Sequence, residues 1–199
     1  MSAVPAGNTY DKFNTSNPIA QRLMRGFLAS FNGLYQRAQA RHVLEVGCGE
    51  GHMLTQMQQQ QPDALYGFDL DYDIVQEAAQ RVPNVGIAQA DAHRLPFASA
   101  QFDLVVACEV LEHVAHPSQV LAEIQRVTRR YAILSVPREP IWRILNLARG
   151  KYWPALGNTP GHIQHWGSDA FSALVSSHFD VLALRQPLPW TMLLAEKRE

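Results

Sequence analysis

A glycine-rich turn directly after a short apolar segment constrains the fold of this chain more than any other feature. Residues 43–46 are Val-Leu-Glu-Val, a pattern typical of a strand buried in a parallel sheet, and glycines follow at positions 47, 49 and 51. The residues after Gly51 have the pattern of a helix start. Glycine at a strand-to-helix turn tolerates positive φ and carries no Cβ, so a ligand can lie against the backbone. The sequence therefore predicts a ligand site at this turn.

The glycine spacing and one acid indicate the kind of ligand. The spacing is G-x-G-x-G, which differs from the G-x-G-x-x-G that cradles a pyrophosphate. Glu45 lies at the end of the strand, where its carboxylate would repel a diphosphate and attract an ammonium group. Because S-adenosylmethionine carries an amine and a sulfonium, these residues favour it over a dinucleotide.

Two further strand ends carry acids in register with this turn. A predicted second strand begins at Leu65, and Asp69 is the first acid after it, where a nucleotide-binding βαβ unit accepts hydrogen bonds from ribose hydroxyls. We expect Asp71 to cap the following helix. A third strand over 85–89 is followed by Asp91, which can accept from an adenine amino group, and by Ala92, which leaves room for the ring.

These segments together resemble the class I S-adenosylmethionine-dependent methyltransferases, and more narrowly the branch that includes the ubiquinone and menaquinone biosynthesis methylases. The resemblance rests on VLEVGCGEG at 43–51, GFDLD at 67–71, QADAHRLPFASAQFDLVV at 89–106 and EVLEHV at 109–114. Its motifs cover roughly residues 41–136, and residues 168–198 match by pattern only. It implies a methionine end lined by Glu45, Gly47, Cys48 and Gly49, a ribose held by Asp69 and Leu70, an adenine held by Asp91 and Ala92, and a pocket closed above the sulfonium by Cys108 and Glu109.

The alternation of strands and helices predicts an α/β fold: a Rossmann-like, seven-stranded, mostly parallel sheet with helices on both faces and a closing antiparallel strand. We expect a single domain over residues 1–199. Its parts would be an N-terminal arm and helix (1–40), a cofactor-binding core (41–136), a lid insertion (137–167), and a C-terminal helix with closing strands (168–199). The first helix would begin at Asn17-Pro18, bury Ile19 among other apolar residues, and have a point where it can break at Asn32-Gly33.

Composition narrows the class of protein. The chain has 199 residues and a formal net charge of −1, which gives no global attraction for nucleic acid or anionic membranes. Its two cysteines, Cys48 and Cys108, form no disulfide framework and are expected to be small filler side chains in a reducing compartment. The N-terminal residues lack the charged and apolar regions of a signal peptide, and no segment approaches the ~20 apolar residues of a spanning helix. We therefore expect a cytoplasmic protein.

Histidines at the predicted mouth are the catalytic candidates. Methyl transfer from a sulfonium is an in-line displacement that needs close positioning and, for a hydroxyl or an acidic carbon, a base. His113 follows the fourth predicted strand, and His162 and His165 follow the fifth. We select these three as catalytic candidates; the alternative for each is that it caps a helix end or bonds a loop carbonyl.

Glu109, Glu112 and His113 form an E-x-x-E-H motif that leaves several functions open. The motif resembles the stretch that ligates a divalent ion in ubiquinone-pathway O-methyltransferases and small-RNA 2′-O-methyltransferases, and carboxylates with imidazole suit Mg²⁺, Mn²⁺ or Zn²⁺. The same letters are common in relatives without a metal. Our interpretation is a methyltransferase of a small molecule at oxygen or carbon. The alternatives are a metal-assisted RNA ribose 2′-O-methyltransferase and a non-catalytic S-adenosylmethionine-binding assembly subunit, against which the intact motif set counts.

The lid insertion indicates the acceptor. Because it leaves the end of the fifth predicted strand, it should roof the ligand site and be mobile without ligands. It combines aromatic residues with cations, which suits a lipid-linked or anionic small-molecule acceptor: Arg138, Trp142, Arg143, Arg149, Lys151, Tyr152, Trp153 and Trp166. Nucleic acid is disfavoured, because no second basic patch supports it and no Asn/Asp-Pro-Pro-Tyr/Phe motif for methylation of nucleobase amines is present. The oligomeric state and the acceptor itself cannot be derived from the sequence.

Overall fold

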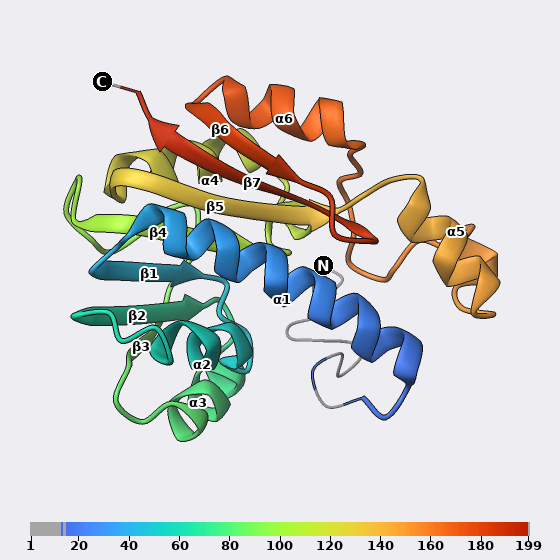
Figure 1. Cartoon of the computed structure of the whole chain (residues 1–199), viewed down its shortest axis with the longest axis horizontal. Coiled ribbons are helices and arrows are strands. Elements are labelled where there is room, and N and C mark those ends of the chain that lie inside the picture. Colours follow the sequence, from blue (N-terminus) through green and yellow to red (C-terminus); the bar gives the residue numbers. More distant parts are fainter. Residues whose placement is uncertain (1–12, 14, 199) are drawn as a thin grey trace.

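The structure, a computed structural model, describes residue 13 and residues 15–198. Most of the predicted N-terminal arm, including the residues on which the signal-peptide prediction rests, lies outside this range. The described residues form one seven-stranded sheet with helices on both of its faces (Figure 1).

The sheet has the predicted class of topology. Its strand order is β3-β2-β1-β4-β5-β7-β6, and β7 is antiparallel to both of its neighbours while the other pairs are parallel. The strand order reverses between β1 and β4, so their carboxyl ends flank the position where open α/β sheets bind ligands. The strands are β1 (His42–Val46), β2 (Ala64–Asp69), β3 (Gly86–Gln89), β4 (Phe102–Cys108), β5 (Thr128–Pro137), β6 (Phe179–Arg185) and β7 (Trp190–Lys197).

Two apolar layers bury both faces of the sheet. Val43 packs toward one layer with residues of the first three helices, and Leu44 packs toward the other with residues of α4 and α6. β4 is buried along nearly its whole length, as expected of a central parallel strand. The helices are α1 (Pro18–Ala38), α2 (His52–Gln58), α3 (Tyr72–Arg81), α4 (Pro117–Val127), α5 (Ile141–Ala148) and α6 (Ser168–Ser176), with short 3₁₀ turns η1 (Leu111–His113) and η2 (Trp153–Ala155).

Local side chains fix the helix starts as predicted. The Asn17 side chain accepts hydrogen bonds from the N–H groups of Ile19 and Ala20, at 2.9 and 3.3 Å. Asp71 does the same for the N–H groups of Asp73 and Ile74, at 2.9 and 3.2 Å. Each cap satisfies donors that have no partner inside the helix.

Two expectations for α1 are wrong. The helix continues through Asn32-Gly33, because Phe31 and Leu34 on either side are buried and hold the backbone against the sheet. Ile19 is 70% exposed and does not join the core, because the first turn of α1 extends past the end of the sheet (Figure 1).

α5 lies apart from the other helices. It leaves the carboxyl end of β5 and projects beyond the edge of the sheet on the side toward which the parallel strands point (Figure 1). Within residues 13 and 15–198, no helix combines the length and apolar character that crossing a bilayer requires.

Candidate cofactor and acceptor site

The glycine turn joins β1 to α2 and presents one open backbone position. Gly47, Gly49 and Gly51 have φ of +68°, +51° and +81°, values that L side chains rarely adopt. A Cβ added to Gly47 would lie 2.5 Å from a Val110 methyl group, so this glycine allows protein packing. A Cβ on Gly49 would meet no atom of the described residues within 4 Å. Gly49 therefore faces the open side of the turn, where a ligand can approach.

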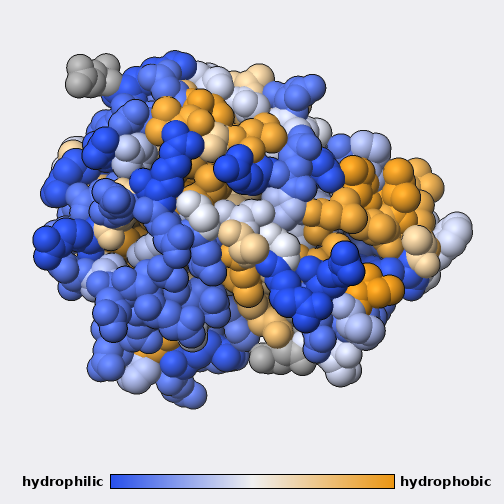
Figure 2. All heavy atoms as spheres, viewed as in Figure 1, coloured by the Kyte–Doolittle hydropathy of each residue, from blue (hydrophilic) through white to orange (hydrophobic). Residues whose placement is uncertain are grey.

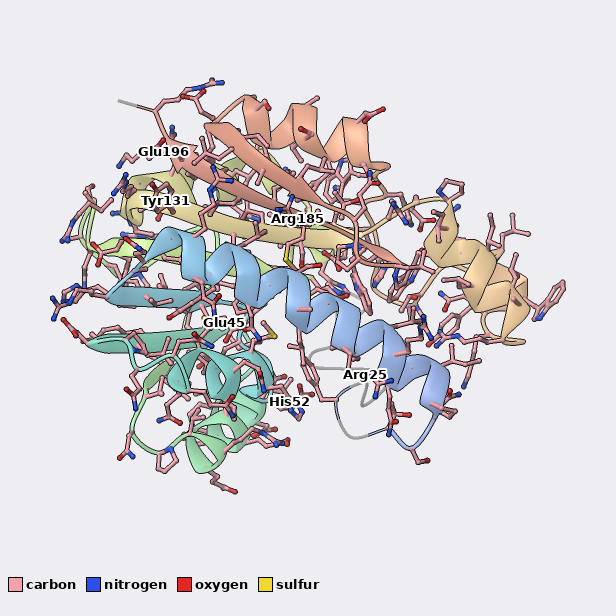
Figure 3. The ribbon with its side chains drawn as sticks, in the orientation of Figure 1. Arg25, Glu45, His52, Tyr131, Arg185 and Glu196 are labelled. Atoms are coloured by element: carbon pink, nitrogen blue, oxygen red, sulfur yellow. The ribbon has the colours of Figure 1, made fainter. Side chains whose placement is uncertain are left out.

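Glu45 is a buried carboxylate next to this turn. It is 2% exposed, and its Oε2 has no hydrogen-bond partner among the described residues. Burial, and then the nearby charge of Asp69, raise the pKa of Glu45 well above its usual range, while a hydrogen bond from the Leu54 backbone lowers it. Figure 3 shows Glu45 on β1 and His52 at the start of α2. A buried acceptor of this kind fits a ligand ammonium group.

Asp69 lies at the carboxyl end of β2 and contacts the glycine turn. Its Oδ2 accepts a hydrogen bond from the N–H of Gly49 at 3.0 Å, and its Oδ1 accepts one from the N–H of Asp71 at 3.3 Å. A carboxylate has about four lone-pair sites, so acceptor capacity remains for ribose hydroxyls. Leu70 beside it is 65% exposed, which leaves an apolar surface that a bound nucleoside could cover.

Asp91 and Ala92 lie beyond β3, on the same edge of the sheet. The N–H of His93 donates to Asp91 Oδ1 at 2.9 Å, and His93 Nδ1 lies 2.7 Å from the same oxygen. The pKa of Asp91 is lowered, mainly by the backbone hydrogen bond from His93. Partial burial raises this pKa, and the hydrogen bond from the His93 side chain lowers it further. The side chain of Asp91 is 57% exposed, so it is an ionised acceptor that a ligand amino group can reach.

Glu109 follows β4 in a strained conformation. Its φ is +59°, unusual for a residue with a side chain, and its Oε1 accepts a hydrogen bond from Trp190 Nε1. Sequence reasoning missed Trp190; the available signal was that a buried indole N–H needs an acceptor. Cys48 is buried, and burial raises the pKa of its thiol, while Cys108 is half-buried; neither forms a disulfide among the described residues. The predicted role of small filler side chains fits these environments.

Three of the predicted mouth residues come together. The ligand atoms of Glu112, His113 and His162 all lie within 4.8 Å of one another. The His113 and His162 rings meet edge to face with centroids 4.9 Å apart, and His113 Nδ1 lies 3.0 Å from the Gly161 carbonyl oxygen. Glu109, the third predicted metal ligand, is not in this group of described residues; its side chain contacts Trp190 instead.

His165 lies apart from this group. It is exposed, and its Nε2 lies 2.8 Å from Asn158 Oδ1. Partial desolvation and the charge of Arg143 lower the pKa of His165.

A series of aromatic rings connects the lid to the sheet. Phe27 of α1 contacts Trp190 of β7 at 5.0 Å, Trp190 contacts Trp142 of α5 at 5.9 Å, and Trp142 stacks on His162 at 5.8 Å between centroids. The base of the lid is closed by the hydrogen bond from the Glu139 N–H to the Trp166 carbonyl, at 2.9 Å. The lid therefore lies at the carboxyl end of the sheet, beside Glu109 and η1.

Comparison with known proteins matches the core of the chain to a methyltransferase domain. Residues 44–136 match the family model described as "Methyltransferase domain". A "Probable S-adenosylmethionine-dependent methyltransferase" of Mycobacterium tuberculosis is 33% identical over 109 residues, which are 53% of this chain and 38% of that protein. Residues 44–136 therefore form a methyltransferase domain similar to that of the S-adenosylmethionine-dependent enzymes. S-adenosylmethionine is the cofactor of these enzymes. The chain spans less than two fifths of the length of the curated relatives that it matches first.

Solved structures support the methyltransferase fold over nearly the whole chain. A protein of Pyrococcus horikoshii OT3 has a TM-score of 0.72 at 17% identity, with 96% of this chain and 97% of that chain covered. Magnesium protoporphyrin IX methyltransferase from Synechocystis PCC 6803, solved with bound SAH, has a TM-score of 0.68 at 17% identity, with 93% and 90% covered. At this identity the likeness shows the fold alone.

Proposed function

We propose that this methyltransferase transfers a methyl group from S-adenosylmethionine to the oxygen or carbon of a small-molecule acceptor. The observation that carries the proposal is the arrangement of three residues at the ends of β1 and β2. Glu45 is a buried carboxylate, and its Oε2 lacks a hydrogen-bond partner among the described residues. Gly49 faces open space, and Asp69 holds the glycine turn through the hydrogen bond from the Gly49 N–H.

The residues of the core have separate roles in holding the cofactor. Glu45 would balance the charge of the ligand ammonium, and Gly49 would let the backbone approach it. Asp69 and Asp91 would accept hydrogen bonds from the ribose and the adenine, with Leu70 and Ala92 against the rings. The wall of the cofactor pocket would be completed by Gly47, Cys48, Cys108 and Glu109. When bound, S-adenosylmethionine supplies an electrophilic methyl group on a sulfonium.

His113 and His162 are the proposed proton acceptors. A carbonyl oxygen only accepts hydrogen bonds, so the contact between Gly161 and His113 Nδ1 requires the proton on Nδ1. In the neutral ring, Nε2 of His113 then carries the lone pair, which is the form that acts as a general base. His162 lies beside it and is 8% exposed, so the His162 ring is shielded from bulk water, while His113 is half-buried. We place His165 outside the reacting centre, because it is exposed and bonded to Asn158.

The domain organisation that we propose is a single domain over residues 1–199. Residues 41–136 would bind the cofactor, residues 137–167 would form the acceptor lid, and α1 together with the described residues 168–198 would complete the layers around the sheet. The aromatic contacts among Phe27, Trp142 and Trp190 support this division, because they join the first helix, the lid and the last strand in one packed unit.

Binding and transfer are tested separately. Calorimetric titration with S-adenosylmethionine and, as a comparison, NAD tests the cofactor; binding of NAD alone would overturn the proposal. The protein is then incubated with S-adenosylmethionine labelled in the methyl group and a cell extract, which is separated into small-molecule, lipid, RNA and protein fractions. We expect label in the small-molecule or lipid fraction, and much less of it with Asp69→Ala at an S-adenosylmethionine concentration near the wild-type Kd. Label in RNA would favour the ribose methyltransferase, and binding without any labelled product would favour the assembly subunit.

A metal-assisted reaction is a second candidate, favoured by the grouping of Glu112, His113 and His162. These donors suit Mn²⁺ or Zn²⁺, which could polarise an acceptor hydroxyl. Calorimetric titration with MnCl₂ or ZnCl₂ alone tests the site, with Glu112→Gln as the disrupting variant and His165→Ala as the control. Binding that is lost only in Glu112→Gln would support the metal, whereas no heat of binding to the wild-type protein would exclude it.

A further inference from the structure

α5 and the loop after it form one compact unit, residues 141–157, which we call the lid hairpin. Asn146 is buried at its centre, where its side-chain amide donates to the Gly157 carbonyl at 2.8 Å. The N–H of Lys151 donates to the Asn146 carbonyl, also at 2.8 Å. Gly157 lies so close to α5 that an added Cβ would be 2.4 Å from the Arg143 carbonyl oxygen. The hairpin therefore has a core of its own and a defined outer surface.

That outer surface is apolar. Ile144 is 57% exposed, Trp153 is 63% exposed and Leu156 is 72% exposed, and Ile163 just beyond the hairpin is 52% exposed. These four are among nine large apolar residues that are exposed in the described part of the chain, so this short segment carries a disproportionate share. Figure 2 shows a cluster of hydrophobic residues at the end of the molecule where α5 lies.

The charges of the same segment have one sign. No aspartate or glutamate occurs from residue 140 to residue 168, while Arg143, Arg149 and Lys151 lie within the hairpin. The whole chain carries a formal net charge of −1, so the hairpin is a cationic region on a slightly acidic protein. An exposed tryptophan and aliphatic side chains among cations are the combination that seats a helix in the interface of an anionic bilayer.

We propose that the lid hairpin docks on the surface of an anionic lipid bilayer and that the acceptor is therefore a membrane-borne molecule. Trp153 and Leu156 would enter the interfacial layer, and Arg149 and Lys151 would lie at the lipid phosphates. Because the hairpin leaves the carboxyl end of β5, docking would bring the mouth beside Glu109 and His162 to the membrane. The identity of the acceptor rests on the proposed methyl transfer, whereas the docking does not.

Vesicle sedimentation tests the docking with the full chain. Vesicles of pure phosphatidylcholine are compared with vesicles that contain one quarter phosphatidylglycerol, at low and at high salt. We expect partition onto the anionic vesicles only, decreasing with salt. Trp153→Ser combined with Leu156→Ser should reduce partition at least tenfold, and Tyr72→Ser, an equally exposed aromatic on α3, should leave it unchanged. Lys151→Gln should reduce partition about fivefold, and Arg37→Gln at the far end of α1 should not.

Three results would overturn the docking proposal. They are no partition of the wild-type protein onto anionic vesicles, equal partition onto neutral vesicles, and partition that the Trp153 and Leu156 changes leave intact. Light scattering of the same samples detects the other occupant: a wild-type dimer that becomes a monomer in the double variant, without vesicle binding, would assign the surface to a second copy of the chain. Titration with S-adenosylmethionine in the same samples separates failure of the docking from failure of the proposed function.

Discussion

The carboxylate of Asp69 accepts a hydrogen bond from the backbone N–H of Gly49 at 3.0 Å, and this bond joins the end of β2 to the glycine turn after β1. One acid therefore fixes the turn and also lies at the position proposed for the ribose. Its second oxygen is held by the N–H of Asp71, at 3.3 Å. The site is thus ordered by its own hydrogen bonds before any ligand binds, which reduces the entropy that binding must overcome.

Asp69→Ala should weaken S-adenosylmethionine binding by roughly 1.5–3 kcal/mol, because both the ribose hydrogen bonds and the bond to Gly49 are lost. Asp69→Asn keeps one acceptor oxygen and should weaken binding less than the alanine change. Calorimetric titration of the three proteins measures the differences. Equal affinity of Asp69→Ala and the wild-type protein would show that Asp69 serves the turn and not the ligand.

Gly49→Val should abolish cofactor binding while the protein stays folded. The added methyl groups would occupy the open side of the turn, and a φ of +51° is costly for a β-branched residue. Gly150→Val is the matched control, because Gly150 has a φ of +70° and equally open surroundings but lies at the end of α5. Circular dichroism confirms folding in both variants. If both bind S-adenosylmethionine like the wild-type protein, this turn has no contact with the ligand.

Cofactor affinity should increase with pH through Glu45. Its pKa is raised in the folded protein, so above the ordinary carboxyl range the folded state holds a proton that the unfolded state releases. The contribution of Glu45 to stability is therefore lost as pH increases through this window. A ligand ammonium favours the ionised form, so binding should release the proton and strengthen by at most about tenfold per pH unit.

Glu45→Gln tests both consequences of this shift. Its affinity for S-adenosylmethionine should be lower than that of the wild-type protein and nearly independent of pH in the same window. Its free energy of unfolding should lack the decrease with pH that Glu45 causes. Calorimetry and urea unfolding at several pH values measure the two quantities, and parallel pH profiles of the two proteins would exclude Glu45 as the group involved.

Gly33→Ala in α1 should stabilise the protein by roughly 0.5–1 kcal/mol, because glycine inside a helix loses more conformational freedom on folding than alanine. The position is exposed, and a Cβ there would meet no atom of the described residues within 4 Å. Thermal unfolding measures the change. A decrease in stability would indicate that α1 bends at Asn32-Gly33 in solution, as the sequence alone suggested.

The sequence predicted the sheet well because local patterns determine it, and the same kind of pattern carries the predicted cofactor residues, which stay a prediction. The glycine positions, the acid after β2 and the caps at Asn17 and Asp71 are readable from spacing, and each is a short-range interaction. The side-chain environments depend instead on residues far apart in the chain. Glu109 contacts Trp190, which is 81 positions away, and no periodicity relates the two.

The acceptor side of the site was the least predictable part, because its side chains are placed by contacts between residues far apart in the chain. The sequence identified His113, His162 and His165 as equivalent candidates, but tertiary packing separates them. His162 stacks on Trp142 of α5 and meets His113 of η1, whereas His165 bonds Asn158 within its own loop. The expected mobility of the lid stays a prediction, and the contacts at Trp142 and Asn146 locate where it should be tested.

Asn146→Ala should loosen the lid hairpin without affecting the cofactor turn. The buried side chain donates to the Gly157 carbonyl at 2.8 Å and to Thr159 Oγ1 at 3.1 Å. Thr159 Oγ1 keeps the hydrogen bond from Trp142 Nε1, but removal of the Asn146 amide takes this donor from the Gly157 carbonyl, at a local cost of about 1–3 kcal/mol. Hydrogen exchange of residues 151–159 should accelerate, while S-adenosylmethionine affinity stays within twofold, because the glycine turn lies on other elements. Asn158→Ala is the control, since Asn158 is only half-buried and bonds His162 and His165 outside the hairpin. Equal exchange in Asn146→Ala and the wild-type protein would show that the hairpin is held by its contacts with the sheet and not by its own core. The outer surface proposed for membrane docking would then depend on the contacts of Trp142.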